Sequence, residues 1–285
     1  MKTIRQTKIG TVLYVAVLIV TMSWMQQHAL AESEPLADPV ENAQLSEEEA
    51  AVKDMLMRMA EFLSKTPQFS VNLKASYDVY QESGQMIEFS ESRKIIVSRP
   101  SGLRVDVDQS DGEKQLVQYD GKEITVFSPS QNVYAQASKS GGIDEAVIYF
   151  LRDLGMRLPL AMLLTSRLPA EIERRTQSFN YVEKTVIDGV PVHHLAGRTE
   201  TADYQAWISE GDQPLPLRIV LTYKNAAGHP AFRAQFSDWN LTPEVKDSLF
   251  AFTPPEGIQK IPFLAEVHEI SYEGSTNSEQ TGESK

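Results

Sequence analysis

The sequence predicts a mainly β protein with added helices (α+β), built on a curved antiparallel sheet of about ten or eleven strands. The first observation is alternation: between Phe69 and Phe252, apolar and polar residues alternate over many short runs. In one run Leu103, Val105 and Val107 alternate with polar neighbours. Such runs are typical of strands with one face buried and one face in water.

The second observation is the turn chemistry between the runs. Gly-containing pairs stand at 83–84, 111–112, 120–121, 188–189 and 227–228. Asp-Gly pairs in particular favour tight hairpins whose twist matches that of the strands. With no βαβ repeat between them, successive strands are expected to form a meander.

An N-terminal helix precedes the strands. Ser46 is its expected N-cap, Glu49 completes a capping box, and Pro67 stops the helix just past Lys65. One apolar stripe runs along it at helical spacing, made of Val52, Met55, Leu56, Met59 and either Phe62 or Leu63. A narrow stripe predicts that the helix packs on the dry face of the sheet.

A compact apolar insert at about 143–175 interrupts the strands and is expected to be helical. It contains a helix over 143–154 that Gly155 can end, a second apolar run over 158–164, and a third, charged run over 169–174. Placed midway through a meander, these pieces are expected to cap an open mouth of the curved sheet or to fill its concave face.

The two ends of the chain are expected to lie outside the folded domain. Residues 1–31 have the basic start, apolar stretch and Ala29-Leu30-Ala31 site of a cleaved export signal, which indicates a periplasmic protein. The rival interpretation is a retained membrane anchor. Residues 32–45 suit an acidic flexible linker, 46–265 the folded domain, and 266–285 a disordered polar tail.

Charge and cysteine content restrict the partners. Cleavage removes three cations and no anions, which leaves 24 basic against 39 acidic residues, a net charge of −15. A surface this negative argues against nucleic acid as a partner. The chain has no Cys, so the domain depends on its hydrophobic core rather than on disulfides. After signal cleavage no integral membrane span is expected.

Several short motifs carry a resemblance. Residues 95–100 (Ile-Ile-Val-Ser-Arg-Pro), 119–122 (Tyr-Asp-Gly-Lys) and 250–257 (Phe-Ala-Phe-Thr-Pro-Pro-Glu-Gly) resemble segments of the periplasmic lipoprotein carrier family LolA. The chain resembles more closely a family of exported bacterial proteins of unknown function with a related fold, through 203–207, 211–216 and 238–240.

The resemblance implies a half-open antiparallel barrel that helices close and apolar side chains line. In the LolA family this cavity takes lipoprotein acyl chains, and an Arg in the Arg-Pro motif helps to hold the lid shut. The matching residue is Arg99. The competing interpretation is that Arg99 ends a strand and pairs with a surface acid.

Catalytic and metal-binding motifs are sparse, so we expect neither enzymatic activity nor a cofactor or metal. The sequence has no Cys nucleophile, Gly-x-Ser-x-Gly, His-Glu-x-x-His or Gly-rich phosphate loop. His193 and His194 are adjacent on an expected strand and point to opposite faces, so they cannot share one metal ion. Glu171 and Glu173, next to Arg174, are expected on a solvated helix face.

The candidate ligand-binding residues combine this Arg with apolar side chains of the insert and of a late strand: Arg99, Phe150, Leu151, Met156, Met162, Phe232 and Phe236. Such residues usually fill a core, but Met also suits surfaces that accept variable ligands.

Two functions fit these observations. The first is a non-enzymatic carrier of a lipid or lipoprotein acyl chain in the envelope. The second is a module that binds an envelope protein or senses stress. A hydrolase is a weak third. The inner volume separates the first two: several hundred cubic ångströms would suit a ligand, whereas a sealed core would favour the interaction module.

Overall fold

The computed structural model describes residues 45–156 and 158–263, and the statements below concern this part of the chain. The expected signal peptide (1–31) and polar tail (266–285) lie outside the described residues. So does the expected linker (32–45), apart from Leu45.

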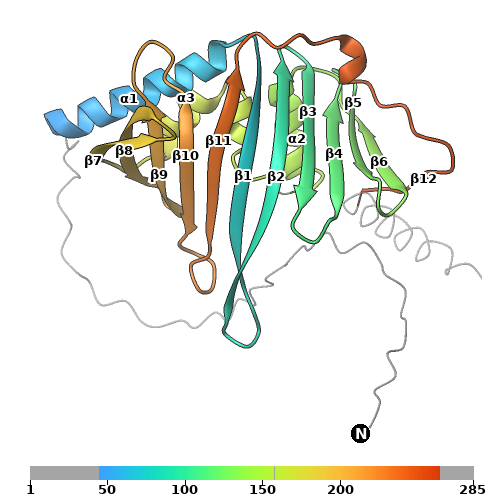
Figure 1. Ribbon diagram of the computed structural model, residues 1–285, viewed down its shortest axis with the longest axis horizontal. Helices are drawn as coiled ribbons and strands as arrows, with labels where there is room; N and C mark the ends of the chain where they lie inside the picture. Colours follow the sequence, from blue (N-terminus) through green and yellow to red (C-terminus); the bar gives the residue numbers. More distant parts are fainter. Residues whose placement is uncertain (1–44, 157, 264–285) are drawn as a thin grey trace, which may run out of the picture. The chain divides into compact units, whose positions relative to one another are not determined.

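Twelve strands of the described chain form one sheet, in the order β12-β6-β5-β4-β3-β2-β1-β11-β10-β9-β8-β7 (Figure 1). The first half comprises β1 (Gln68–Tyr80), β2 (Met86–Ser98), β3 (Gly102–Gln109), β4 (Lys114–Tyr119), β5 (Glu123–Ser128) and β6 (Val133–Ser138). The second half comprises β7 (Ser178–Ile187), β8 (Val190–Arg198), β9 (Ala202–Ser209), β10 (Pro216–Tyr223), β11 (Ala231–Asn240) and β12 (Gln259–Lys260).

Two meanders meet at β1, which lies between β2 and β11. Strands β2 to β6 follow one another on one side of β1, and β7 to β11 follow one another on the other. Every pair is antiparallel except β12 with β6. The predicted mainly β antiparallel fold is therefore confirmed. The additional strand is β12, whose two residues are too short to show alternation.

The predicted capping and stop signals of the N-terminal helix are confirmed, the insert is helical as expected, and one 3-10 turn is additional. The helices are α1 (Glu47–Lys65), α2 (Ile143–Arg152), the 3-10 turn η1 (Ala161–Leu164), α3 (Leu168–Arg175) and the additional 3-10 turn η2 (Asp247–Leu249). Ser46 and Glu49 form the expected capping box at the start of α1. Of the two alternatives for its apolar stripe, Leu63 is fully buried and Phe62 is partly exposed.

The order of the strands determines where the insert lies. Strands β6 and β7 are consecutive in the chain but stand at opposite sides of the sheet, so residues 139–177 cross one of its faces. We call this the inner face; α2 and α3 are seen behind the strands in Figure 1. Buried residues of α1, α2, η1 and α3 pack with those of the sheet into one hydrophobic core.

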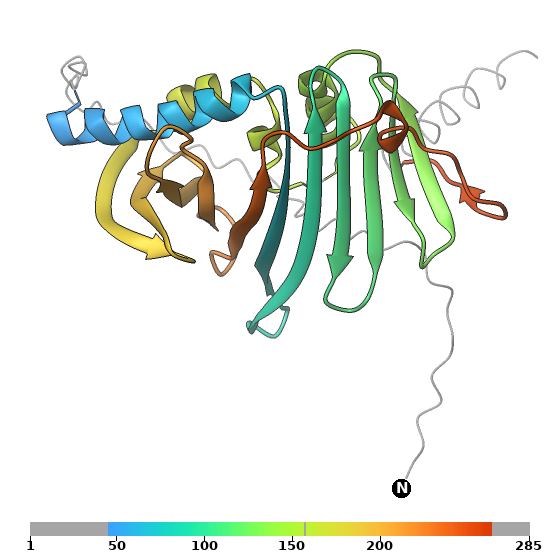
Figure 2. The ribbon, with the colours of Figure 1, turned by 45° about the horizontal axis from the view of Figure 1, so that its top comes forward.

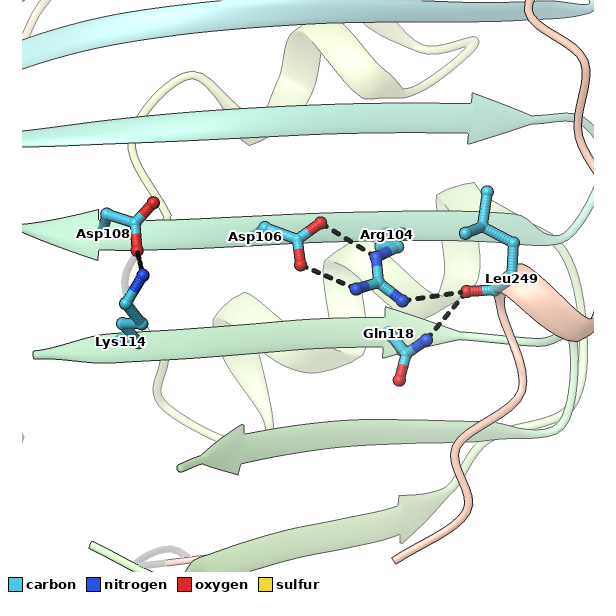
Figure 3. Close-up of polar contacts among 6 residues, drawn as sticks. All are labelled: Arg104, Asp106, Asp108, Lys114, Gln118 and Leu249. Atoms are coloured by element: carbon cyan, nitrogen blue, oxygen red, sulfur yellow. Dashed lines mark hydrogen bonds and ion pairs between the residues drawn. The ribbon is translucent and has the colours of Figure 1, made fainter. Parts of the chain in front are cut away.

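A C-terminal strap (residues 241–258) connects β11 to β12 across the opposite, outer face, in front of the strands in Figure 2. Its anchor is the carbonyl oxygen of Leu249, which accepts hydrogen bonds from Gln118 Nε2 at 2.8 Å and Arg104 Nη1 at 3.4 Å (Figure 3). Arg104 is held in turn by both carboxylate oxygens of Asp106. Next to this anchor the Phe250 ring packs over Gly102, so closely that a Cβ there would lie 2.7 Å from the ring.

Among the described residues, no helix is both long enough and apolar enough to cross a membrane.

Candidate functional site

An apolar site lies on the inner face, between the centre of the sheet and residues 158–164, which we call the plug segment. The sheet contributes side chains from β1, β2, β3 and β11, and the plug segment covers them. The lining residues are Phe69, Val71, Leu73, Arg93, Ile95, Val105, Leu158, Pro159, Leu160, Ala161, Leu163, Leu164, Phe236 and Trp239. The free space between them is about 20 Å³, close to what one water molecule needs. This site is therefore filled, not open.

A β-bulge turns Trp239 into this site. Asp238 has a φ of +55°, and the register between β1 and β11 shifts at this point. Asn72 Nδ2 donates to the Asp238 carboxylate at 2.9 Å and holds the bulge. Because of the extra residue, Phe236 and Trp239 lie on the same face, with ring centres 5.8 Å apart. Trp239 Nε1 donates to the Pro216 carbonyl at 3.1 Å, which fixes the indole.

The plug segment is held mainly by apolar contacts. Between it and the sheet, the described residues contain one hydrogen bond, from Arg93 Nη1 to the Pro159 carbonyl at 3.3 Å. The next residue, Leu160, has a φ of +65°. A bulky side chain in this left-handed region costs about 1–3 kcal/mol. The plug segment therefore occupies the trough with backbone strain and little polar attachment.

Arg93 and Glu91 form a buried ion pair on the inner face of β2. Their side chains are only 7% and 10% exposed. The guanidinium carbon of Arg93 lies 5.7 Å from the centre of the Phe232 ring. Sequence reasoning missed this pair. The available signal was its register, since both residues share the inward positions of β2 with Ile95 and Val97, where an apolar side chain is expected.

Arg99 lies at the end of α1 rather than in the plug. Its Nε donates to the Thr66 carbonyl at 3.1 Å and its Nη2 to the Leu63 carbonyl at 3.3 Å. Burial lowers the pKa of the Arg99 guanidinium, and the Asp144 carboxylate at the start of α2 opposes that shift. Arg99 thus joins β2 to the carboxyl end of α1, and its role as a latch stays a prediction.

The other predicted ligand residues divide between sheet and insert. Phe236 lines the cavity, and Phe232 lies beside Arg93. Phe150 is buried on α2, whereas Leu151, Met156 and Met162 are partly buried against the same core. The structure therefore brings all six apolar residues to one core, but one of them contacts the cavity itself.

The titratable residues form separate pairs. His194 stacks on Trp207 with ring centres 3.9 Å apart, while His193 contacts Tyr181 and Glu210. Glu171 pairs with Arg174 and Arg175, and Glu173 pairs with Lys53. Within the described ranges, no group of three or more His, Cys, Asp or Glu side chains could hold a metal ion.

Three solved structures show how far the similarity extends. The chain has 15% identity and a TM-score of 0.44 with lipoprotein LppX of Mycobacterium tuberculosis, covering 69% of this chain and 99% of that one. With a LolA superfamily protein of Nitrosomonas europaea it has 13% identity and a TM-score of 0.37, covering 70% of this chain and 97% of that one. With the MucA/MucB complex structure of Pseudomonas aeruginosa it has 20% identity and a TM-score of 0.38, covering 71% of this chain and 61% of that one.

No curated protein matches the chain. The model of a family described as "Predicted periplasmic protein (DUF2092)" matches residues 52–264. The resemblance to a family of exported bacterial proteins is confirmed. The chain therefore belongs to the DUF2092 family of predicted periplasmic proteins.

Proposed function

We propose that this protein is exported to the periplasm by a cleaved signal peptide and there binds the acyl chain of a lipid or lipoprotein. The protein holds the acyl chain against the inner face of the sheet and catalyses no reaction on it. The observation that carries the proposal is the cavity lining, in which thirteen of fourteen residues are apolar and Arg93 is the exception. Burying a hydrocarbon chain against such a surface contributes about 0.8 kcal/mol per methylene.

The filled interior makes this proposal depend on movement of the plug segment. A space of 20 Å³ cannot accept an acyl chain, so the ligand has to replace the plug's own Leu side chains. Three features support such an exchange: the apolar character of the plug, the strained backbone of Leu160, and the single hydrogen bond from Arg93. The filled cavity thus corresponds to a closed form of the site.

The proposal can be tested with Trp239 as the reporter. Of the three Trp residues, Trp24 belongs to the expected signal peptide and Trp207 lies in another part of the sheet, stacked on His194. Mature protein carrying Trp207→Phe therefore reports from the cavity alone. A fatty acid ester brominated along its chain should quench this fluorescence saturably, whereas the same ester without bromine should not. Absence of quenching at any concentration would refute acyl binding.

The filled interior also favours a second candidate, a protein-interaction module. Exposed apolar side chains give it a surface, since Val182, Val186 and Val190 at the β7–β8 hairpin are 49%, 61% and 40% exposed. Two experiments separate the candidates. Lipid that co-purifies after mild extraction, identified by mass spectrometry, supports the carrier. Ligand-free protein that captures one envelope protein in a pull-down supports the module.

A further inference from the structure

The Glu91–Arg93 pair occupies two positions at which the sheet itself does not require a charged residue. Arg93 lies opposite Leu73 on β1 and Val107 on β3, and Glu91 lies opposite Ala75 on β1 and Gln109 on β3. Burying two charges among mostly apolar neighbours carries a desolvation cost that an ion pair often fails to recover. A buried pair at the wall of a candidate ligand site is therefore a candidate for recognition rather than for stability.

The hydrogen bonds of Arg93 leave part of its guanidinium unused. Its Nη2 faces Glu91 and its Nη1 donates to the Pro159 carbonyl. Its Nε is buried and has no hydrogen-bond partner within the described residues. A buried N–H without an acceptor is unfavourable. Because Arg93 also lines the cavity, it has spare capacity to donate to a ligand.

The charge of the pair determines which acceptor fits. Glu91 already neutralises Arg93, so an incoming carboxylate would be repelled by Glu91 in a medium of low dielectric. A neutral carbonyl brings no such repulsion. The acceptor that Arg93 binds in the closed state is itself a neutral carbonyl, the peptide oxygen of Pro159. An ester or amide carbonyl could take over the same hydrogen bond when the plug segment leaves.

The pair also marks where the covered part of the inner face ends. On one side of it along β2 lies Ile95, which lines the cavity under the plug segment. On the other side, Phe89 and Ile87 are 41% and 36% exposed, and the Tyr77 ring stacks on Phe89. Burial raises the pKa of the Tyr77 hydroxyl, and the Glu91 charge raises it further. A ligand whose tail takes the place of the plug segment would therefore have its head group at this boundary.

We propose that the Glu91–Arg93 pair binds the ester or amide carbonyl at the head of an acyl ligand and discriminates against free fatty acids. This inference rests on the proposed acyl binding and adds the chemistry of the head group. It assigns Arg93 as the donor and Glu91 as the residue that excludes a carboxylate.

The experiment compares two probes with the same chain, a brominated palmitic acid and its methyl ester, delivered from cyclodextrin at pH 8 to the Trp207→Phe protein. The ester should bind at least tenfold more tightly. Because the ester also partitions more readily out of water, the decisive quantity is the change of the ester-to-acid affinity ratio between variants.

Glu91→Gln leaves Arg93 with an uncompensated charge, so this ratio should fall at least tenfold. The matched control is Glu88→Gln, because Glu88 is an exposed carboxylate on the same strand that pairs with Arg233, and it should leave the ratio unchanged. The double variant Glu91→Gln/Arg93→Gln has no charge to attract the acid and should keep the preference for the ester. It also covers the case in which Glu91→Gln alone fails to fold, because without the Arg93 donor the ester should bind several-fold more weakly than to the wild type.

The outcomes separate this inference from the proposed function. If both probes quench Trp239 but Glu91→Gln leaves the ratio unchanged and the double variant binds the ester as tightly as the wild type, the head-group assignment is wrong and acyl binding stands. If neither probe quenches, the head-group assignment and the proposed acyl binding are both wrong.

Discussion

The Arg99 guanidinium caps the carboxyl end of α1 through Thr66, with 3.1 Å between Arg99 Nε and the Thr66 carbonyl oxygen. The carbonyls at this end of a helix have no partner within the helix and carry partial negative charge, so a cation there is favourable. A residue proposed as a latch is thus bound to a helix that contacts both β7 and α3.

Arg99→Leu should lower the free energy of unfolding by about 1–3 kcal/mol, because it removes the donor to the partly buried Thr66 carbonyl and one of the two donors to the Leu63 carbonyl. If Arg99 also acts as the predicted latch of the lid, the variant should take up and release the brominated ester faster. Urea unfolding and stopped-flow quenching of Trp239 measure the two effects. Arg99→Lys keeps the charge and should recover part of both. Unchanged uptake and release in Arg99→Leu would remove the latch role.

Val71→Phe should abolish or strongly weaken acyl binding, because Val71 lines the cavity and a larger ring would occupy the ligand's space. The matched control is Val192→Phe, since Val192 is equally buried but lies outside the core cluster around the cavity. Both changes overpack the interior and should cost about 1–3 kcal/mol of stability. Titration with the brominated ester distinguishes them, and equal loss of binding in both would argue against the site.

Gly102→Ala should displace the C-terminal strap, because its methyl group would lie 2.7 Å from the Phe250 ring, which is 6% exposed. In a Phe250→Ala background the same change should cost much less, since the ring is gone. The coupling in this double-mutant cycle should be about 0.5–3 kcal/mol, measured by denaturant unfolding. Additive effects would show that the strap does not depend on this contact.

Acid should weaken the fold partly through Asp78. Hydrogen bonds from Arg233, and to a lesser degree from the Ala231 amide, hold the pKa of the Asp78 carboxyl below its ordinary value of 3.8, although burial opposes this. The unfolded chain therefore binds this proton at higher pH than the folded one. The stabilisation is fully present above the ordinary value and is lost as pH falls through the lowered pKa.

Asp78→Asn should accordingly be less stable than the wild type at neutral pH, and the difference should shrink as the pH falls from about 5 to 2. Urea unfolding across that range measures it. Asp212→Asn, in an exposed turn, serves as the control. A difference that stays constant with pH would exclude Asp78 as a contributor.

Much of the fold could be predicted because its causes are local. Alternation placed the strands, the capping box placed the start of α1, and Gly-containing turns placed the hairpins. The crossing of the sheet by the insert is different in kind. It depends on β1 pairing with β11, a contact between distant parts of the chain.

The site was harder to predict for the same reason. Trp239 faces the cavity only because Asp238 adopts a positive φ, which alternation does not reveal. The filled interior depends on how the plug segment's Leu side chains fit between those of the sheet, and composition does not fix that fit. Glu91 and Arg93 were visible as charges at inward positions, and a strict check of strand parity would have found them.

The short strand β12 has a consequence for self-association. It pairs with only Val133 and Tyr134 of the six-residue β6, so among the described residues the rest of the β6 edge and the outer edge of β7 have no neighbouring strand. Unpaired strand edges are templates for further pairing. Pairing between two β7 edges would add one copy of the chain and then stop, because two such edges satisfy each other. Growth into a filament would also need the β6 edge, which β12 shortens by two residues.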